Sequence, residues 1–279
     1  MGTSASYLAA VGTWAVLSVG VAQAQAPAPA PAVAQASAET PVSAKTWLEN
    51  RAAIEAYLRD TEIVSIEELK VGVTHPRRAK FPDGGLVQYM AFKNVPPGRT
   101  SGYWESYKSE LAAYAMDQLL GLEMVPPTVE KRVKGDLGAA VMWCAPVKSF
   151  SELKGVPTPP GRYIAAWFRQ LAKAKMFDNL IGNKDPNLGN WLVDPAWNLI
   201  LIDHTRAFTP DKDLYHKLDH VDVPLWEKMK ALTVESLTPV LSPYMGGAEI
   251  KAVIGRRDKM ADAIAKLVKD KGEGEVLMK

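Results

Sequence analysis

The chain has 279 residues, of which 47% are hydrophobic and 23% charged, a composition typical of a globular protein. Its formal net charge of +2 provides no bulk attraction to nucleic acid, so we expect no nucleic-acid partner. The single cysteine, Cys144, excludes an internal disulfide and any metal site of the CxxC type.

The first 26 residues predict a secretory signal peptide. Residues 7–22 are almost all apolar or small, and Ala22-Gln23-Ala24-Gln25-Ala26 contains two overlapping A-x-A cleavage sites. The apolar run is shorter than the roughly 20 residues that cross a bilayer. No Lys or Arg precedes Lys45, so an uncleaved anchor or a misplaced start codon stays open as an alternative. We expect an exported protein, periplasmic or secreted, without a stable membrane span after cleavage.

The rest of the chain predicts a linker followed by one α+β domain. Residues 27–44 are rich in Ala and Pro, which favour an extended spacer, so the folded domain is expected at 45–279. Periodicity and turn residues predict a small β-rich lobe at about 60–148 and a larger helical lobe at about 160–271. Strands are expected within 63–73, 87–92 and 129–143, and helices at 47–59, 103–120, 163–181, 214–230 (broken at Pro224), 234–241, 248–254 and 256–271. The tail from Gly272 is expected to be frayed.

One polar loop in the helical half contains the residues most suited to chemistry. It follows a predicted helix that ends at Gly182, and it contains Asp185 and Asn190. The apolar runs 191–193 and 199–202 flank an Asp-Pro turn and predict a hairpin. Because a hairpin brings its two ends together, Asn190 and Asp203 should lie close to each other. Pro186 keeps Asp185 out of helical geometry.

These side chains suit phosphoryl transfer. Oxygen ligands without sulfur favour Mg²⁺ or Mn²⁺, and a carboxylate that does not bind the metal can accept a proton from an attacking hydroxyl. The alternative is a polar turn whose Asn and Asp side chains only cap backbone groups. The five-residue gap from Asp185 to Asn190 equals the Asp-to-Asn gap of the kinase catalytic loop and favours function. We therefore predict Asp185 as base or orienting group and Asn190 and Asp203 as metal ligands.

These motifs resemble those of atypical kinases. Asn183-Lys184-Asp185 with Asn190, followed by Ile202-Asp203-His204, is similar to the catalytic and metal-binding segments of the secretory-pathway kinases related to the Golgi casein kinase. Phosphatidylinositol kinases and persistence-toxin kinases are similar more distantly. Those families carry Asn-x-Asp-Arg and Ile-Asp-Asn/His-Gly, whereas this chain has Pro186 in place of Arg and Thr205 in place of Gly. The resemblance implies a bilobal protein-kinase-like fold that binds ATP with Mg²⁺ or Mn²⁺.

The resemblance also implies cofactor-binding residues in the first lobe. Residues 89–93 are similar to the strand whose Lys holds the phosphates of ATP, which points to Lys93, although Lys93 equally fits a solvated lysine at a strand end. The predicted helix after it carries Glu105 and Glu110, and Glu110 resembles the partner of that Lys. Residues 140–143 resemble the strand entering the hinge that meets adenine, which implies roles for Met142 and Trp143.

A glycine-rich phosphate loop is missing from the sequence. Residues 72–78 occupy its expected place but contain one glycine, and no G-x-G-x-x-G motif occurs there. Arg77, Arg78 and Lys80 either contact phosphate or form a solvated loop. Two weaker features are His216 and His220, four residues apart on a predicted helix, and Cys144, which fits a small core residue better than a nucleophile.

The sequence thus predicts a metal-dependent phosphotransferase that moves the γ-phosphoryl group of ATP to a hydroxyl of a protein, lipid or sugar. The missing Arg and glycine-rich loop motivate an alternative, a pseudokinase that serves as a nucleotide-binding regulatory module. Transfer of AMP is a third possibility. Export complicates the choice of donor, because a bacterial-type signal leads to a compartment poor in ATP.

Overall fold

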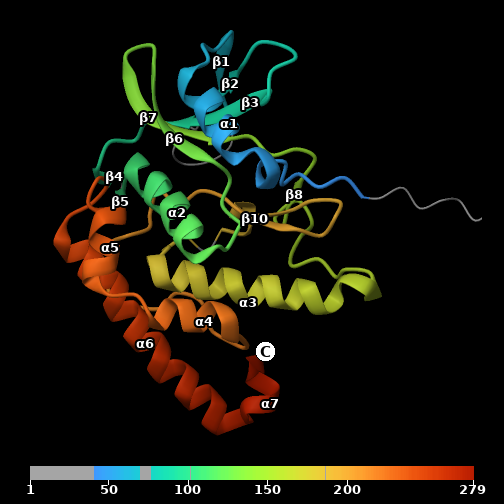
Figure 1. Ribbon diagram of the computed structural model, residues 1–279, viewed down its shortest axis with the longest axis vertical. Coiled ribbons are helices and arrows are strands. Elements are labelled where there is room, and N and C mark those ends of the chain that lie inside the picture. The colour runs from blue at the N-terminus through green and yellow to red at the C-terminus, as the bar shows by residue number, and fades with distance from the viewer. Residues whose placement is uncertain (1–40, 70–76, 101, 186) are drawn as a thin grey trace, which may run out of the picture. The chain divides into compact units, whose positions relative to one another are not determined.

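The computed structural model describes residues 41–69, 77–100, 102–185 and 187–279. The predicted signal peptide, most of the predicted linker, Gly72–Pro76 and Pro186 lie outside these ranges. Thr40–Lys279 form one compact unit with an α+β, bilobal architecture (Figure 1). Of the helices in the described ranges, none combines the length and apolar character needed to cross a membrane.

The β-rich lobe is an antiparallel sheet in the order β1-β2-β3-β7-β6, with helix α1 beside it (Figure 1). Trp47, Ile54 and Leu58 recur at helical spacing on α1, and all three are buried in one cluster with inward-facing residues of the sheet. The burial of β6 alternates, as expected for a sheet with one packed face. The elements are α1 Trp47–Asp60, β1 Ser65–Glu68, β2 Arg77–Lys80, β3 Tyr89–Lys93, β6 Thr128–Val133 and β7 Asp136–Met142.

Helix α2 (Tyr107–Leu120) begins four residues later than the sequence predicted. Tyr103–Glu105 is strand β5, which pairs with β4 (Gly98–Thr100), so Glu105 lies on a strand and the helical prediction for it is wrong. The helix starts after Ser106 because the Ser106 hydroxyl accepts a hydrogen bond from the backbone N–H of Lys108. Gly121 ends the helix in the left-handed conformation, as predicted.

The second lobe is mainly helical and contains the predicted hairpin. Strands β9 (Trp191–Val193) and β10 (Leu199–Leu201) pair antiparallel, and β8 (Lys148–Ser149) extends them to three strands. The 3₁₀ turns are η1 Gly161–Tyr163 and η2 Leu188–Asn190. The remaining elements are α3 Ile164–Ile181, β11 Val221–Asp222, α4 Val223–Lys230, α5 Val234–Leu241, α6 Gly247–Lys271, α7 Glu273–Val276 and β12 Leu277–Met278.

Three predictions for the C-terminal part are wrong. Residues 214–220 are not helical, and Pro224 lies in the first turn of α4, where its missing N–H leaves no intrahelical bond unmade. Helix α6 runs unbroken through Gly255, because buried residues on both sides of it pack against the core. The tail is not frayed, since β12 pairs parallel with β11.

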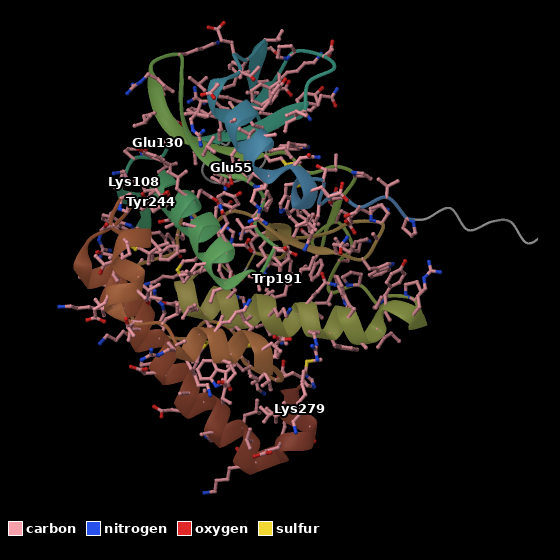
Figure 2. The ribbon with its side chains drawn as sticks, in the orientation of Figure 1. Glu55, Lys108, Glu130, Trp191, Tyr244 and Lys279 are labelled. Carbon is pink, nitrogen blue, oxygen red and sulfur yellow. The ribbon has the colours of Figure 1, made fainter. Side chains whose placement is uncertain are left out.

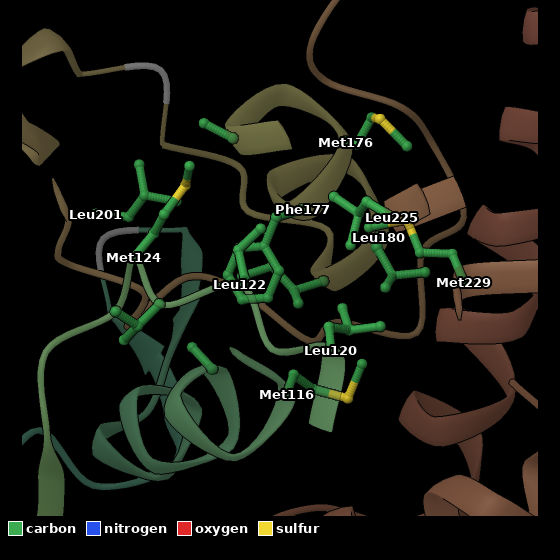
Figure 3. Packing of buried hydrophobic residues seen from close by; sticks show 14 of the residues in the cluster. Met116, Leu120, Leu122, Met124, Met176, Phe177, Leu180, Leu201, Leu225 and Met229 are labelled. Atoms are coloured by element: carbon green, nitrogen blue, oxygen red, sulfur yellow. The ribbon is translucent and has the colours of Figure 1, made fainter. Parts of the chain in front are cut away.

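One apolar core anchors α2 to the helical lobe. Met116 and Leu120 of α2 belong to the same buried cluster as Phe177 and Leu180 of α3 (Figure 3). Near its N-terminus, α2 instead buries Leu111 in a cluster with residues of β7. Glu110 therefore lies on a helix that is packed between the sheet and the helical lobe.

Candidate active site

Lys93 joins the two lobes through two carboxylates. It ends strand β3 and is only 8% exposed. Its Nζ lies 2.6 Å from Oε1 of Glu110 on α2 and 2.7 Å from Oδ1 of Asp203, which follows β10. The alternative of a solvated strand-end lysine does not hold. Burial by itself lowers the pKa of the Lys93 amine, but Asp203 and Glu110 outweigh it and hold that pKa above its ordinary value.

Glu110 is buried, and Lys93 and the backbone N–H of His204 compensate its carboxylate. Besides Lys93, the backbone N–H of His204 donates to Glu110 Oε1 at 3.0 Å, and His204 Nδ1 lies 3.6 Å from Oε2. Burial by itself raises the pKa of Glu110, yet Lys93 and His204 lower it to about 2. Glu110 thus contacts both Lys93 and the segment that follows β10.

Asp203 has a constrained backbone. Its φ of +63° is a left-handed conformation that non-glycine residues seldom adopt, and such strain gathers at functional sites. Thr205 Oγ1 donates to Asp203 Oδ1 at 3.1 Å. The Thr205 carbonyl accepts the N–H of Ser106, the residue that caps α2. The turn after β10 is therefore attached to the first turn of α2.

The loop of residues 183–190, called here the 183–190 loop, is held by Asp178 of α3. The Asn183 amide donates to Asp178 Oδ1 at 3.2 Å, and the Trp191 indole donates to Asp178 Oδ2 at 3.1 Å. Figure 2 shows Trp191 beside α3, and its ring also stacks on His216. Sequence reasoning missed Asp178. The only signal was an Asp five residues before Asn183, and this spacing is common at helix ends.

Asp185 lies in the 183–190 loop and has a polar neighbour at each carboxylate oxygen. Oδ1 accepts the backbone N–H of Asn187 at 3.0 Å, and Oδ2 lies 3.9 Å from Nη1 of Arg206. Arg206 in turn is bound to Glu105. Sequence reasoning noted Glu105 only as a helical residue and missed Arg206, whose signal was its position three residues after Asp203.

Asn190 and Asp203 are brought together by the hairpin, as predicted from the apolar runs. The N–H of Ile202 donates to the Asn190 carbonyl at 2.9 Å, so the residues before β9 and after β10 are neighbours. Asn190 is buried, and its Nδ2 has no hydrogen-bond partner among the described residues. An amide and a carboxylate fit Mg²⁺ or Mn²⁺, which bind one or two such groups plus waters and phosphate oxygens. The described ranges contain no cluster of three or more His, Cys, Asp or Glu suited to a metal.

A cavity of about 410 Å³ opens beside these charges. It is mostly apolar but includes Lys93 and Asp203, and this combination suits a ligand with a flat apolar part and a charged part. It is lined by Ala91, Lys93, Val141, Met142, Trp143, Cys144, Ala145, Pro146, Val147, Ser149, Glu152, Leu192, Ile202 and Asp203.

Met142 and Trp143 line this cavity. Their backbone N–H groups already donate hydrogen bonds within the protein. The Met142 N–H donates to the Pro127 carbonyl at 2.9 Å and the Trp143 N–H to the Tyr89 carbonyl at 3.1 Å. These two N–H groups are therefore not free to meet a ligand. Burial raises the pKa of Cys144 to about 12, so its thiol stays neutral and is a poor nucleophile.

The remaining basic residues of the sequence prediction bind carboxylates on the protein surface. Arg77 pairs with Asp136, Arg78 with Glu67, and Lys80 with Asp83. His216 lies 3.5 Å from Asp178, and no helix places it on one face with His220. The histidine pair thus loses the geometric basis for a shared metal.

The chain was compared with protein-family models, curated proteins and solved structures. No protein-family model matches the sequence, and none of the curated proteins does. Among solved structures, a hydra Fam20 with sugar is similar at 16% identity and a TM-score of 0.61, with 81% of this chain and 91% of the other covered. The Golgi casein kinase with Mn and ADP bound is similar at 16% identity and a TM-score of 0.62, with 81% and 78% covered.

The chain has a protein-kinase-like fold. This confirms the predicted fold class and the resemblance to the Golgi casein kinase group. In the kinase-like fold of this chain, β1–β3, β6 and β7 form the N-lobe and α3–α6 belong to the C-lobe. Identities of 16% establish the fold alone, so activity must be argued from the side chains of this chain.

Proposed function

We propose that the protein is a metal-dependent phosphotransferase that moves the γ-phosphoryl group of ATP to a hydroxyl acceptor. The observation that carries the proposal is the position of Lys93, within hydrogen-bond distance of Glu110 and Asp203 at the edge of a mostly apolar cavity. Lys93 and the 26% exposed Asp203 both line this cavity, and a phosphate clamp needs a cation that faces the cavity.

Each residue has a proposed role. Lys93, oriented by Glu110, holds phosphate oxygens of the nucleotide. Asn190 and Asp203 hold Mg²⁺ or Mn²⁺, which when bound neutralises charge on the transferring phosphate. Asp185 accepts or orients the proton of the acceptor hydroxyl. That the similar Golgi casein kinase was solved with Mn and ADP supports this choice of cofactors.

The apolar part of the cavity is the proposed adenine site. Side chains of Met142 and Trp143 pack against the base there. Because the N–H groups of these two residues are used within the N-lobe, we expect any backbone contact to adenine from Cys144 or Ala145.

We also propose that the protein is exported. We retain the signal peptide at 1–26, the linker at 27–44 and the kinase-like domain at 45–279 as proposals. An intracellular location, a different phosphoryl donor or a eukaryote-like secretory lumen would each resolve the conflict between export and the use of ATP.

The test is turnover of ATP by the purified protein with Mg²⁺ or Mn²⁺. We expect metal-dependent transfer or hydrolysis of ³²P from the γ position, reduced at least about 100-fold in Asp185→Asn and Asp203→Asn. Asp213→Asn is the matched control, because Asp213 is an exposed residue of the C-lobe that pairs only with Lys259 among the described residues.

Other outcomes distinguish the alternatives. Label transferred from the α position identifies an AMP transferase. A rise in melting temperature with ATP and metal, but no turnover in any variant, identifies a nucleotide-binding pseudokinase. Absence of both binding and turnover contradicts the proposed function.

A further inference from the structure

We propose that Arg206, fixed by Glu105, is a positioning residue for Asp185; this inference rests on the proposed phosphotransfer function. The residue that follows Asp185 in the chain offers it no cation. Residue 186 is Pro and carries no charge. Arg206 supplies a cation to Asp185 from a different segment, the turn after β10.

The guanidinium of Arg206 is held by Glu105 at one edge and by Tyr103 on its face. Its Nε and Nη2 lie 2.9 and 2.8 Å from Oε1 of Glu105, whose side chain is 3% exposed. The ring of Tyr103 lies against the guanidinium, with 4.5 Å from Cζ to the ring centroid. These contacts leave Nη1 directed to Oδ2 of Asp185 at 3.9 Å. A buried carboxylate that binds one edge of a guanidinium fixes the direction of the other edge.

The same arrangement leaves Asp185 little freedom. Its Oδ1 accepts the Asn187 N–H and its Oδ2 faces Arg206, so rotation of the carboxylate would break one contact or the other. A group that takes a proton from an acceptor hydroxyl must be oriented closely, and a displacement of about 1 Å can cost about 100-fold in rate. Orientation of Asp185, rather than contact with substrate, is therefore the role we assign to Arg206.

Glu105 and Glu110, which lie five residues apart in the chain, bind the cations Arg206 and Lys93. Glu105 directly precedes Ser106, the cap of α2, and Glu110 lies in the first turn of that helix. The N–H of Ser106 donates to the carbonyl of Thr205. Glu110 orients Lys93, and Glu105 orients Arg206. The junction of β5 and α2 thus orients both Lys93, the proposed phosphate clamp, and, through Arg206, the proposed base Asp185.

Arg206 also borders a cavity of about 670 Å³, separate from the proposed nucleotide cavity. Its lining includes Lys184, next to Asp185 in the chain, and the exposed side chains of Tyr103 and Trp104. A small cation in solution can therefore reach the position of the guanidinium when the Arg206 side chain is shortened.

The experiment compares Arg206→Met, Arg206→Lys and Arg206→Ala with wild type in ATP turnover. We expect kcat to fall about 10- to 100-fold in Arg206→Met while KM for ATP changes less than about 3-fold, because the nucleotide contacts remain. Arg206→Lys should recover only part of kcat, since one ammonium cannot replace both N–H contacts to Glu105 Oε1 and also face Asp185. Guanidinium at millimolar concentration should raise kcat of Arg206→Ala, and sodium at the same ionic strength should not.

Arg132→Met is the matched control, because Arg132 is an exposed arginine near the end of β6 that binds the Gly135 carbonyl. Unchanged kcat in Arg206→Met would overturn the positioning role. So would a fall in kcat that follows a loss of melting temperature and is not restored by guanidinium.

A crystal structure of Arg206→Met tests the inference independently of turnover. We expect the Asp185 carboxylate to leave its position beside the Asn187 N–H or to occupy more than one rotamer. An unmoved Asp185 would contradict the inference, even if wild type proved inactive and the proposed function failed.

Discussion

At the scale of single residues, the site is a set of buried charges that compensate one another. Lys93 and Glu110 are each less than 10% exposed, and neither could stay charged alone in so dry an environment. Both the Lys93 amine and the Glu110 carboxylate have pKa values shifted in the direction that favours the charged form. The ion pair therefore contributes to stability, and its contribution must depend on pH.

Glu110 should make the domain sensitive to acid. Its pKa is about 2 in the folded protein, against 4.5 for an ordinary Glu, so the folded state binds the proton more weakly. The stabilisation is complete above pH 4.5 and is lost as the pH falls toward 2, with a size on the order of 3 kcal/mol. Urea unfolding at pH 6 and pH 3 should show a steeper loss for wild type than for Glu110→Gln. Equal slopes for the two proteins would contradict this assignment.

At the scale of elements, the end of α3 determines where the 183–190 loop begins. Gly182 adopts a left-handed φ of +66°, and a Cβ there would lie 2.8 Å from the guanidinium carbon of Arg256. Arg256, on α6, is fully buried and donates to the carbonyls of Leu180, Thr209 and Asp211. One side chain thus caps α3 and fixes the loop that follows the Asp203 turn.

Arg256→Met should destabilise the domain by about 3 kcal/mol, because buried carbonyls at the end of α3 and in the 209–211 loop lose their donor. Lys259→Met, on the same helix but with half of its side chain exposed, should change stability by less than about 0.5 kcal/mol. Urea midpoints at pH 7 measure both. If Arg256→Met is as stable as wild type, water must replace the guanidinium as the donor to these carbonyls.

At the scale of the whole molecule, the start of the compact unit is attached to the C-lobe. The Ala44 N–H donates to Asp194 Oδ2 at 2.9 Å, and Lys45 Nζ donates to the Glu123 carbonyl at 2.6 Å. Asp194 lies in the β9–β10 turn, so residues before α1 contact the hairpin that positions Asn190 and Asp203. Residues 44–45 thus help to hold the hairpin of the site in place, although they do not line the cavity.

A protein that begins at Trp47 should melt about 5–10 °C below one that begins at Pro41. The shorter protein loses both contacts and leaves buried Asp194 with only its own turn as partner. The Pro41 form keeps both contacts and is therefore the reference for the Trp47 form. Equal melting of the Trp47 and Pro41 forms would show that these contacts add no net stability.

The amino-acid sequence by itself determined the local features of this protein. Apolar periodicity located α1, α3 and α5, the hairpin pattern brought Asn190 and Asp203 together, and the spacing of Asp185 and Asn190 indicated the kinase-like fold. These signals are readable because they depend on residues near one another in the chain.

Only the tertiary structure decided where distant charges meet. Glu105 and Arg206 are 101 residues apart, and their pairing depends on how β5 packs on the turn after β10. The same holds for the starts and ends of elements: Ser106 capping, rather than periodicity, began α2, and pairing with β11 ordered the C-terminal tail. A local sequence pattern does not identify such partners. In the unfolded chain each polar side chain hydrogen-bonds to water, and it needs a protein partner only once folding has buried it.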